Sequence, residues 1–191
     1  MAKETIQIRW HGRGGQGAKT AAGMVAELAI DTGSYAQGAP EYGAEREGAP
    51  IKAYTRISER PIRVHDAIYY PDMVLVLDET LLEAENVAEG LVEGGVLLVN
   101  TKRSPAEVRK QLGLKGCKVY TIDATGIAMQ EIGRPIPNTV MVGALSKVSG
   151  RMSAELIEKS IRKKLGGKLS EGMLKGNVNA VRRAFEEVKG E

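Results

Sequence analysis

Near the amino terminus, the apolar positions change from the spacing of a strand to that of a helix. Residues 5–10 (TIQIRW) form a short run rich in strand-forming residues. From Ala18 onward, apolar residues recur at steps of three and four, which gives a helix one apolar face. They are Ala18, Ala21, Ala22, Val25, Leu28 and Ala29. The pattern predicts a strand and then a helix that ends at Gly33 in a left-handed conformation.

The next apolar pattern is the strict alternation of residues 51–57 (IKAYTRI). It places Ile51, Ala53, Thr55 and Ile57 on one face of a strand. A second short run, residues 61–64 (PIRV), follows after the residues SER. Together the two runs predict an antiparallel hairpin at the edge of a sheet.

Three apolar runs then have the composition of buried parallel strands: residues 73–78, 96–100 and 118–124. Helical segments are expected between them, near 79–90 and 104–112. The runs end in Asp78, Asn100 and Asp123, and the carboxyl ends of such strands are where ligands gather in open α/β sheets. For each of the three polar residues, capping the next helix or closing a turn is the preferred interpretation.

The last third of the chain is expected to be helical. Asn138 is placed to cap a helix over 139–148, and Ser153 to cap one over 154–165 that Gly166 and Gly167 end. A final helix carries an apolar stripe made of Leu174, Val178, Val181, Phe185 and Val188. These patterns predict one domain over residues 1–191. Its fold class is α/β, a three-layer, mostly parallel Rossmann-like sheet with an antiparallel edge hairpin and a helical C-terminal third.

The segment between the first strand and the first helix, residues 10–20 (WHGRGGQGAKT), is the strongest candidate for a binding site. Gly12, Gly14 and Gly17 have the G-x-G-x-x-G spacing of a dinucleotide-binding turn. Such a loop offers free backbone N–H groups and the positive end of a helix dipole to a phosphate or another anion. The spacing of a P-loop is absent. The alternative is that the glycines only let the strand and the helix approach closely.

The surrounding sequence argues against a nicotinamide dinucleotide as the ligand. A dinucleotide-binding fold needs a second strand ending in Asp or Glu about 20 residues after the glycines. Asp31 has that spacing but falls at the end of the predicted helix, and residues 34–50 contain no Val or Ile. No buried parallel strand is therefore expected in this stretch, and the element that would hold the ribose is missing.

Composition and charge remove several other classes of function. Lys and Arg number 27 against 24 Asp and Glu, and the charges are interspersed, so no nucleic-acid partner is expected. Cys117 is the single cysteine, and His11 and His65 stand in no metal-ligand spacing. No apolar run reaches the roughly 18 residues of a membrane span. We expect a soluble, cytoplasmic protein with no metal site, no membrane partner and no catalytic residue of its own.

Three longer motifs resemble the gamma subunits of the 2-oxoacid:ferredoxin oxidoreductases. The first is GRGGQGAKTAAGMVAELAIDTG, the second APEYGAEREGAPIKAYTRIS and the third PIPNTVMVGALSKVSG. The resemblance extends over nearly the whole chain. The second motif is the specific one, with the core Tyr42, Gly43, Ala44, Glu45 and Arg46. Its form is most similar to the pyruvate and branched-chain members, although Glu47 stands where an Arg is common.

The resemblance implies a role for the chain as a non-catalytic subunit. In this family the complex oxidatively decarboxylates a 2-oxoacid, reduces ferredoxin and transfers the acyl group to coenzyme A. Thiamine diphosphate and the iron–sulfur clusters are expected on the partner subunits alpha, beta and delta, and no cofactor is expected on this chain alone. A free-standing NAD-binding oxidoreductase and a purely structural scaffold remain as alternatives.

The resemblance also supplies candidate site residues. Those for the phosphates of coenzyme A are Gly12, Arg13, Gly14, Gly15, Gln16, Gly17 and Lys19. Those for contact with the catalytic subunits are Tyr42, Glu45 and Arg46. The sequence leaves open whether the substrate is pyruvate or a branched-chain 2-oxoacid.

Overall fold

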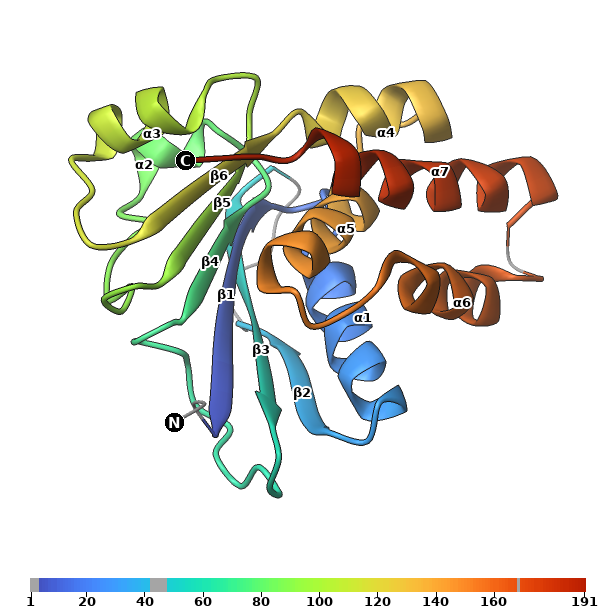
Figure 1. The fold of residues 1–191 in the computed structure, drawn as a ribbon, viewed down its shortest axis with the longest axis horizontal. Coiled ribbons are helices and arrows are strands. Elements are labelled where there is room, and N and C mark those ends of the chain that lie inside the picture. Colours follow the sequence, from blue (N-terminus) through green and yellow to red (C-terminus); the bar gives the residue numbers. More distant parts are fainter. Residues whose placement is uncertain (1–3, 42–47, 168) are drawn as a thin grey trace.

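A computed structural model describes residues 4–41, 48–167 and 169–191 (Figure 1). In this part of the chain, a seven-stranded sheet has the order β2-β3-β1-β4-β5-β6-β7. The strands are β1 (Thr5–Arg13), β2 (Tyr35–Pro40), β3 (Pro50–Ser58), β4 (Met73–Val76), β5 (Val96–Asn100), β6 (Lys118–Ile122) and β7 (Lys189–Gly190). The helices are α1 (Ala18–Asp31), α2 (Leu81–Ala84), α3 (Pro105–Leu112), α4 (Ala124–Ile132), α5 (Asn138–Ser149), α6 (Ala154–Leu165) and α7 (Glu171–Glu187).

The arrangement confirms the α/β class, the central parallel strands and the helical last third. β1, β4, β5 and β6 are parallel neighbours, while β3, β2 and β7 join the sheet as antiparallel strands. The larger apolar core lies between the sheet and α1, α4, α5, α6 and α7. A smaller core lies on the other face, under α2 and α3. Figure 1 shows the two groups of helices on opposite sides of the sheet, which makes three layers.

The predicted edge hairpin is present with a different partner strand. Residues 61–64 do not form a strand. Instead, β3 pairs on one side with β1, along its whole length, and on the other side with β2. The prediction for 61–64 is wrong because β3 already has a neighbour on each side, so a further strand has no edge to join.

Residues 35–40 form β2, a strand that the sequence did not indicate. It is not the buried parallel strand of a dinucleotide-binding fold, because none of its residues is buried and it pairs antiparallel with β3. Since β2 is antiparallel to β3 and β3 is antiparallel to β1, β2 runs in the same direction as β1. At Gly38 the strand lies directly against α1, and only a residue without a side chain fits there. An ideal Cβ on Gly38 would be 2.8 Å from the carbonyl oxygen of Ala22 and 2.9 Å from the Cα of Gly23. Valine or isoleucine, the usual sign of a strand, does not fit at this contact.

The contact between β2 and α1 gives a matched pair of substitutions. We expect Gly38→Ala to lower the free energy of unfolding by about 1–3 kcal/mol, because the new methyl group meets backbone atoms that cannot rotate away. Gly23→Ala is the control, since its ideal Cβ has no heavy atom within 4 Å. Alanine is the better helix former, so the control should gain up to about 1 kcal/mol. Urea unfolding of both variants checks this, and equal effects would contradict the close approach.

Three helix boundaries differ from those expected. The segment near 79–90 contains only the short α2, and α4 begins at Ala124, where a strand was predicted to end. Pro137, not Asn138, is the N-cap of α5, and Asn138 is its first helical residue. The predicted cap of α6 is confirmed, because Ser153 accepts a hydrogen bond from the Leu156 N–H. The left-handed glycine after α1 is also confirmed, because Gly33 has a φ of 92°.

A search of the described helices finds none with both the length and the apolar character needed to cross a membrane.

Candidate functional site

The principal cleft lies where the connections from two neighbouring parallel strands diverge. The chain leaves β1 for α1, on the face of the larger core, and leaves β4 for α2, on the opposite face. Ligands bind at such switch points in open α/β sheets because the diverging connections leave a crevice. Here the crevice has a volume of about 910 Å³, and its lining includes Gln16, Asp78, Asn100, Lys102 and Thr125.

The glycine loop forms one rim of this cleft, and its glycines are required by the local geometry. An ideal Cβ on Gly12 would be 3.3 Å from the Cβ of Ala18, so the strand and the helix are closely packed there. Gly15 and Gly17 have φ values of 97° and 82°, which favour glycine. Gly17 is the N-cap of α1, and no side chain caps this helix. The first N–H groups of α1 are therefore not occupied by a capping side chain, as an anion site requires.

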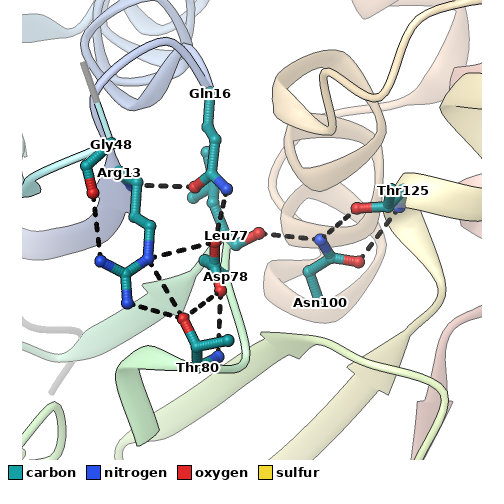
Figure 2. A network of polar contacts seen from close by, with 8 residues as sticks. All are labelled: Arg13, Gln16, Gly48, Leu77, Asp78, Thr80, Asn100 and Thr125. Carbon is teal, nitrogen blue, oxygen red and sulfur yellow. Dashed lines mark hydrogen bonds and ion pairs between the residues drawn. The ribbon is translucent and has the colours of Figure 1, made fainter. Parts of the chain in front are cut away.

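The side chain of Arg13 holds the loop against the turn that follows β4 (Figure 2). Its Nε and NH2 groups donate to Thr80 Oγ1 at 3.1 and 2.8 Å, and NH1 donates to the Gly48 carbonyl at 3.1 Å. Its Nε also lies 3.5 Å from Asp78 Oδ2. The guanidinium thus joins three segments that are far apart in the sequence.

Gln16 makes a second connection between the loop and the turn after β4. Its Oε1 accepts from the Arg13 N–H at 2.8 Å, and its Nε2 donates to Asp78 Oδ2 at 2.6 Å. Burial alone would raise the pKa of Asp78, but the hydrogen bonds from Thr80 and Gln16 and the charge of Arg13 lower it below its usual value. Asp78 is therefore ionised, accepts the hydrogen bond from Gln16 and holds the loop against the turn after β4.

Asn100 connects the neighbouring strand ends in the same way. Its Nδ2 donates to the Leu77 carbonyl and to Thr125 Oγ1, both at 2.8 Å, and its Oδ1 accepts from the Thr125 N–H at 3.1 Å. Asp123 caps α4 by accepting from the Gly126 N–H. The preferred interpretation, a cap or a turn, is confirmed for Asp78 and Asp123. It is wrong for Asn100, which instead joins the end of β5 to Leu77 and to the start of α4, while Ser104 caps α3.

Thr80 and Thr125 were not among the residues singled out from the sequence. Both follow an aspartate by two positions, in Asp78-Glu79-Thr80 and Asp123-Ala124-Thr125. An aspartate that bonds to the backbone two or three residues further on is a common turn or cap signal. The repeated Asp-x-Thr pattern at two strand ends could therefore have indicated both threonines.

The seven candidate phosphate-binding residues lie in one loop, but their side chains have different roles. Arg13 and Gln16 donate hydrogen bonds to Thr80 and Asp78 in the turn after β4. Lys19, in contrast, is exposed in the first turn of α1. Lys19 makes no ion pair with any described residue. The candidate interface residues Tyr42, Glu45 and Arg46 lie outside the described residues, and that assignment remains a prediction.

A second polar group is buried on the opposite face of β1, where sequence analysis assigned no role. Arg9 Nε donates to His11 Nε2 at 3.0 Å, and His11 Nδ1 lies 3.0 Å from Glu85 Oε2. Burial lowers the pKa of His11 to about 4, against the opposing effect of the Glu85 hydrogen bond. The imidazole is therefore neutral at neutral pH, accepts from Arg9 and donates to Glu85. Its role is to accept a hydrogen bond from the buried guanidinium of Arg9.

No described group of side chains has the form of a metal centre: residues 4–41, 48–167 and 169–191 hold no cluster of three or more histidine, cysteine, aspartate or glutamate side chains able to bind an ion. Cys117 is half-buried just before β6. With a single thiol in the sequence, this chain alone does not supply the ligands of an iron–sulfur cluster.

The fold and the cleft define a Rossmann-like α/β protein with a glycine loop at the switch point and no dinucleotide-type arrangement of β2. The model of the pyruvate ferredoxin/flavodoxin oxidoreductase family matches residues 7–187. The chain belongs to this family.

Known relatives cover the chain almost completely. It is 52% identical to pyruvate synthase subunit PorC of Thermotoga maritima, over 99% of this chain and 97% of that one. It is 47% identical to the common gamma subunit of the pyruvate/ketoisovalerate oxidoreductases of Pyrococcus abyssi, over 96% and 97%. The crystal structure of the pyruvate oxidoreductase subunit PORC of Thermotoga maritima superposes with a TM-score of 0.87 at 48% identity, covering 99% of both chains.

Proposed function

We propose that this chain is the gamma subunit of a complex that oxidatively decarboxylates pyruvate, reduces ferredoxin and forms acetyl-coenzyme A. The support is its membership of the family and its near-complete similarity to subunits with pyruvate oxidoreductase names. Thiamine diphosphate and the iron–sulfur clusters belong to the partner subunits alpha, beta and delta in this proposal. The single cysteine is consistent with that division.

Within the complex, this chain shapes the side of the active site that receives coenzyme A. The observation that carries this assignment is the start of α1, where Gly17 leaves the helix without a side-chain cap beside a cleft of about 910 Å³. Coenzyme A carries a pyrophosphate and a further phosphate, and backbone N–H groups at a helix N-terminus bind such groups well. Lys19 adds a cation in the first turn, while Arg13 and Gln16 hold the loop in place.

The position of β2 makes a nicotinamide dinucleotide a poor alternative. In the dinucleotide fold, the acidic residue that binds the ribose ends the strand next to β1. Here β3 lies between β1 and β2, so Glu41, which follows β2, is two strand spacings of about 4.8 Å each away from β1. The Glu41 carboxylate also accepts a hydrogen bond from the Tyr54 hydroxyl at 2.9 Å.

The test is to substitute the glycine loop and compare two Michaelis constants in the purified complex. We expect Gly14→Val to raise KM for coenzyme A at least about tenfold, the equivalent of 1.4 kcal/mol, and to leave KM for pyruvate within about twofold. Viologen reduction at varied coenzyme A, and then at varied pyruvate, gives the two constants. Gly23→Ala, on the same helix but with open space at its Cβ, is the control.

Other outcomes separate the alternatives. Equal increases in both constants would indicate general damage to the complex, and no change would leave the loop with a packing role only. Lys19→Gln, compared with Lys175→Gln on the exposed surface of α7, isolates the effect of the positive charge. Only the first of these should raise KM for coenzyme A, and the increase should shrink at high salt.

A further inference from the structure

The segment between β3 and β4 carries a pair of exposed aromatic side chains. Tyr69 and Tyr70, called here the tyrosine pair, are 67% and 71% exposed. Val64, in the same segment, is 54% exposed. Half of the six large apolar side chains exposed within the described residues therefore lie in one stretch of seven residues, 64–70. Isolated exposed apolar residues are ordinary, but a concentration of them marks a contact surface.

The backbone beneath the tyrosine pair is held from inside the protein. Arg9, itself 6% exposed, donates to the carbonyls of Ile68 at 3.3 Å and Val87 at 3.1 Å. An ideal Cβ on Gly90 would lie 2.0 Å from the Tyr69 carbonyl oxygen, so these two segments are packed backbone to backbone. The backbone that carries the exposed rings is therefore already fixed, so this segment would lose little conformational entropy on binding a partner.

A hollow of about 530 Å³ lies on the same face of the sheet, lined by β2, β3 and residues 65–67. Arg56 anchors this part of the segment by donating to Asp66 Oδ1 at 2.7 Å and to the Asp66 carbonyl at 2.8 Å. Tyr54 also lines the hollow. Burial raises the pKa of its hydroxyl most, the hydrogen bond to Glu41 raises it further, and Tyr69 adds to this effect. Because residues 65–67 line the hollow and Tyr69 follows two positions later, the hollow and the tyrosine pair are neighbouring parts of one surface.

The charges of this hollow indicate what it would contact. Among its described lining residues, the acidic groups are Glu41 and Asp66 and the basic group is Arg56, which pairs with Asp66 at 2.7 Å. Two carboxylates against one guanidinium leave a net charge of −1, on the side of Glu41. In Figure 1, the helices α2 and α3 cover the sheet at β4 to β6, and among the described residues no helix covers β1, β3 and β2 on that side. This face therefore offers negative charge beside aromatic rings, and charge complementarity calls for a basic side chain.

We propose that the tyrosine pair and the adjacent hollow form the docking surface for another subunit of the oxidoreductase complex, which places apolar side chains on the rings and a basic side chain in the hollow. The inference rests on the proposed function only in that the chain is a subunit. Tyrosines are enriched among the residues that dominate binding energy at interfaces, because each combines a large apolar ring with a hydroxyl.

The test measures recovery of the other subunits with the tagged chain from an anaerobic preparation of the complex, read by native mass spectrometry without coenzyme A. We expect the double variant Tyr69→Ser/Tyr70→Ser to recover at least about tenfold less of a partner subunit. Ile30→Ser is the control, since Ile30 is 52% exposed on α1, on the other side of the sheet, and should leave recovery unchanged. Unchanged recovery with the double variant, or an equal loss with the control, would overturn the proposal.

A second measurement keeps the result interpretable if the double variant folds poorly. Tyr70 is replaced by the photo-crosslinking residue p-benzoylphenylalanine, which retains an aromatic ring, and the intact complex is irradiated. A crosslink to a different subunit supports the proposal; crosslinks to a second copy of this chain alone, or none, overturn it. Gly14→Val leaves this surface intact, so its effect on KM for coenzyme A tests the proposed function separately.

Discussion

Trp10→Ala should lower the free energy of unfolding by about 3–5 kcal/mol, as expected when a fully buried tryptophan is truncated. Trp10 is completely buried in the larger core, on the face of β1 that meets α1 and α5. Its indole N–H donates to Thr55 Oγ1 at 3.0 Å, and that hydroxyl donates in turn to the Ala22 carbonyl at 3.1 Å. The substitution therefore leaves a cavity and removes one hydrogen bond. Urea unfolding followed by circular dichroism measures the change.

Trp10→Phe separates the two contributions. Phenylalanine keeps much of the volume but has no N–H, while the Thr55 hydroxyl keeps its acceptor on Ala22. We expect this variant to lose about 1–2 kcal/mol, from the smaller volume and the missing hydrogen bond. If both variants unfold at nearly the same urea concentration as the unchanged chain, Trp10 does not hold the core together at β1.

Arg9→Met should cost about 3–5 kcal/mol, the range seen when one partner of a buried charged network is removed. The methionine side chain fills a similar space but donates no hydrogen bond. The carbonyls of Ile68, Val87 and Glu89 would lose their buried donor, and His11 would lose the group that donates to its Nε2. Each unpaired polar group carries a desolvation cost.

Arg9→Lys is the control for charge. Lysine retains the positive charge, but its single ammonium group cannot reach the several acceptors that the planar guanidinium spans. Its loss of stability should be intermediate. A lysine variant as stable as the unchanged chain would mean that charge, not the spread of hydrogen bonds, is what β1 requires. The segment carrying Tyr69 and Tyr70 should then also keep its position, which hydrogen exchange at residues 66–72 would report.

The parallel centre of the fold could be predicted because each buried strand is a continuous apolar run. β4 and β5 are covered on both faces, so their sequences contain little besides Val and Leu, whereas β6, beside the short edge strand β7, is more mixed. β2 could not be predicted in this way. Its position beside α1 requires Gly38, so a contact between elements, not the strand's own propensity, determines its composition.

Local spacing likewise indicated the glycine loop but not the side chains that hold it. The glycines follow from the φ values of one short turn, which are a local property. The bond between Gln16 and Asp78 joins residues 62 positions apart and depends on the register of β1 against β4. Residues 5–10 were predicted to form a strand, but nothing in the sequence indicated which of its polar side chains are buried. Arg9 and His11 are buried, because irregular segments rather than helices cover their face of the strand.

The contact between Gly38 and Gly23 connects the outer edge of the sheet to the cleft. The hydrogen-bonded backbone of a helix resists bending, so a displacement at one point moves the whole helix. Gly23 lies six residues, or about 9 Å, from Gly17, the N-cap of α1. Any change at β2 that pushes α1 outward therefore tilts a rigid helix whose first turn carries the N–H groups proposed to bind coenzyme A. In this way the edge strand β2, although remote from the cleft, affects the orientation of the glycine loop beside the cleft.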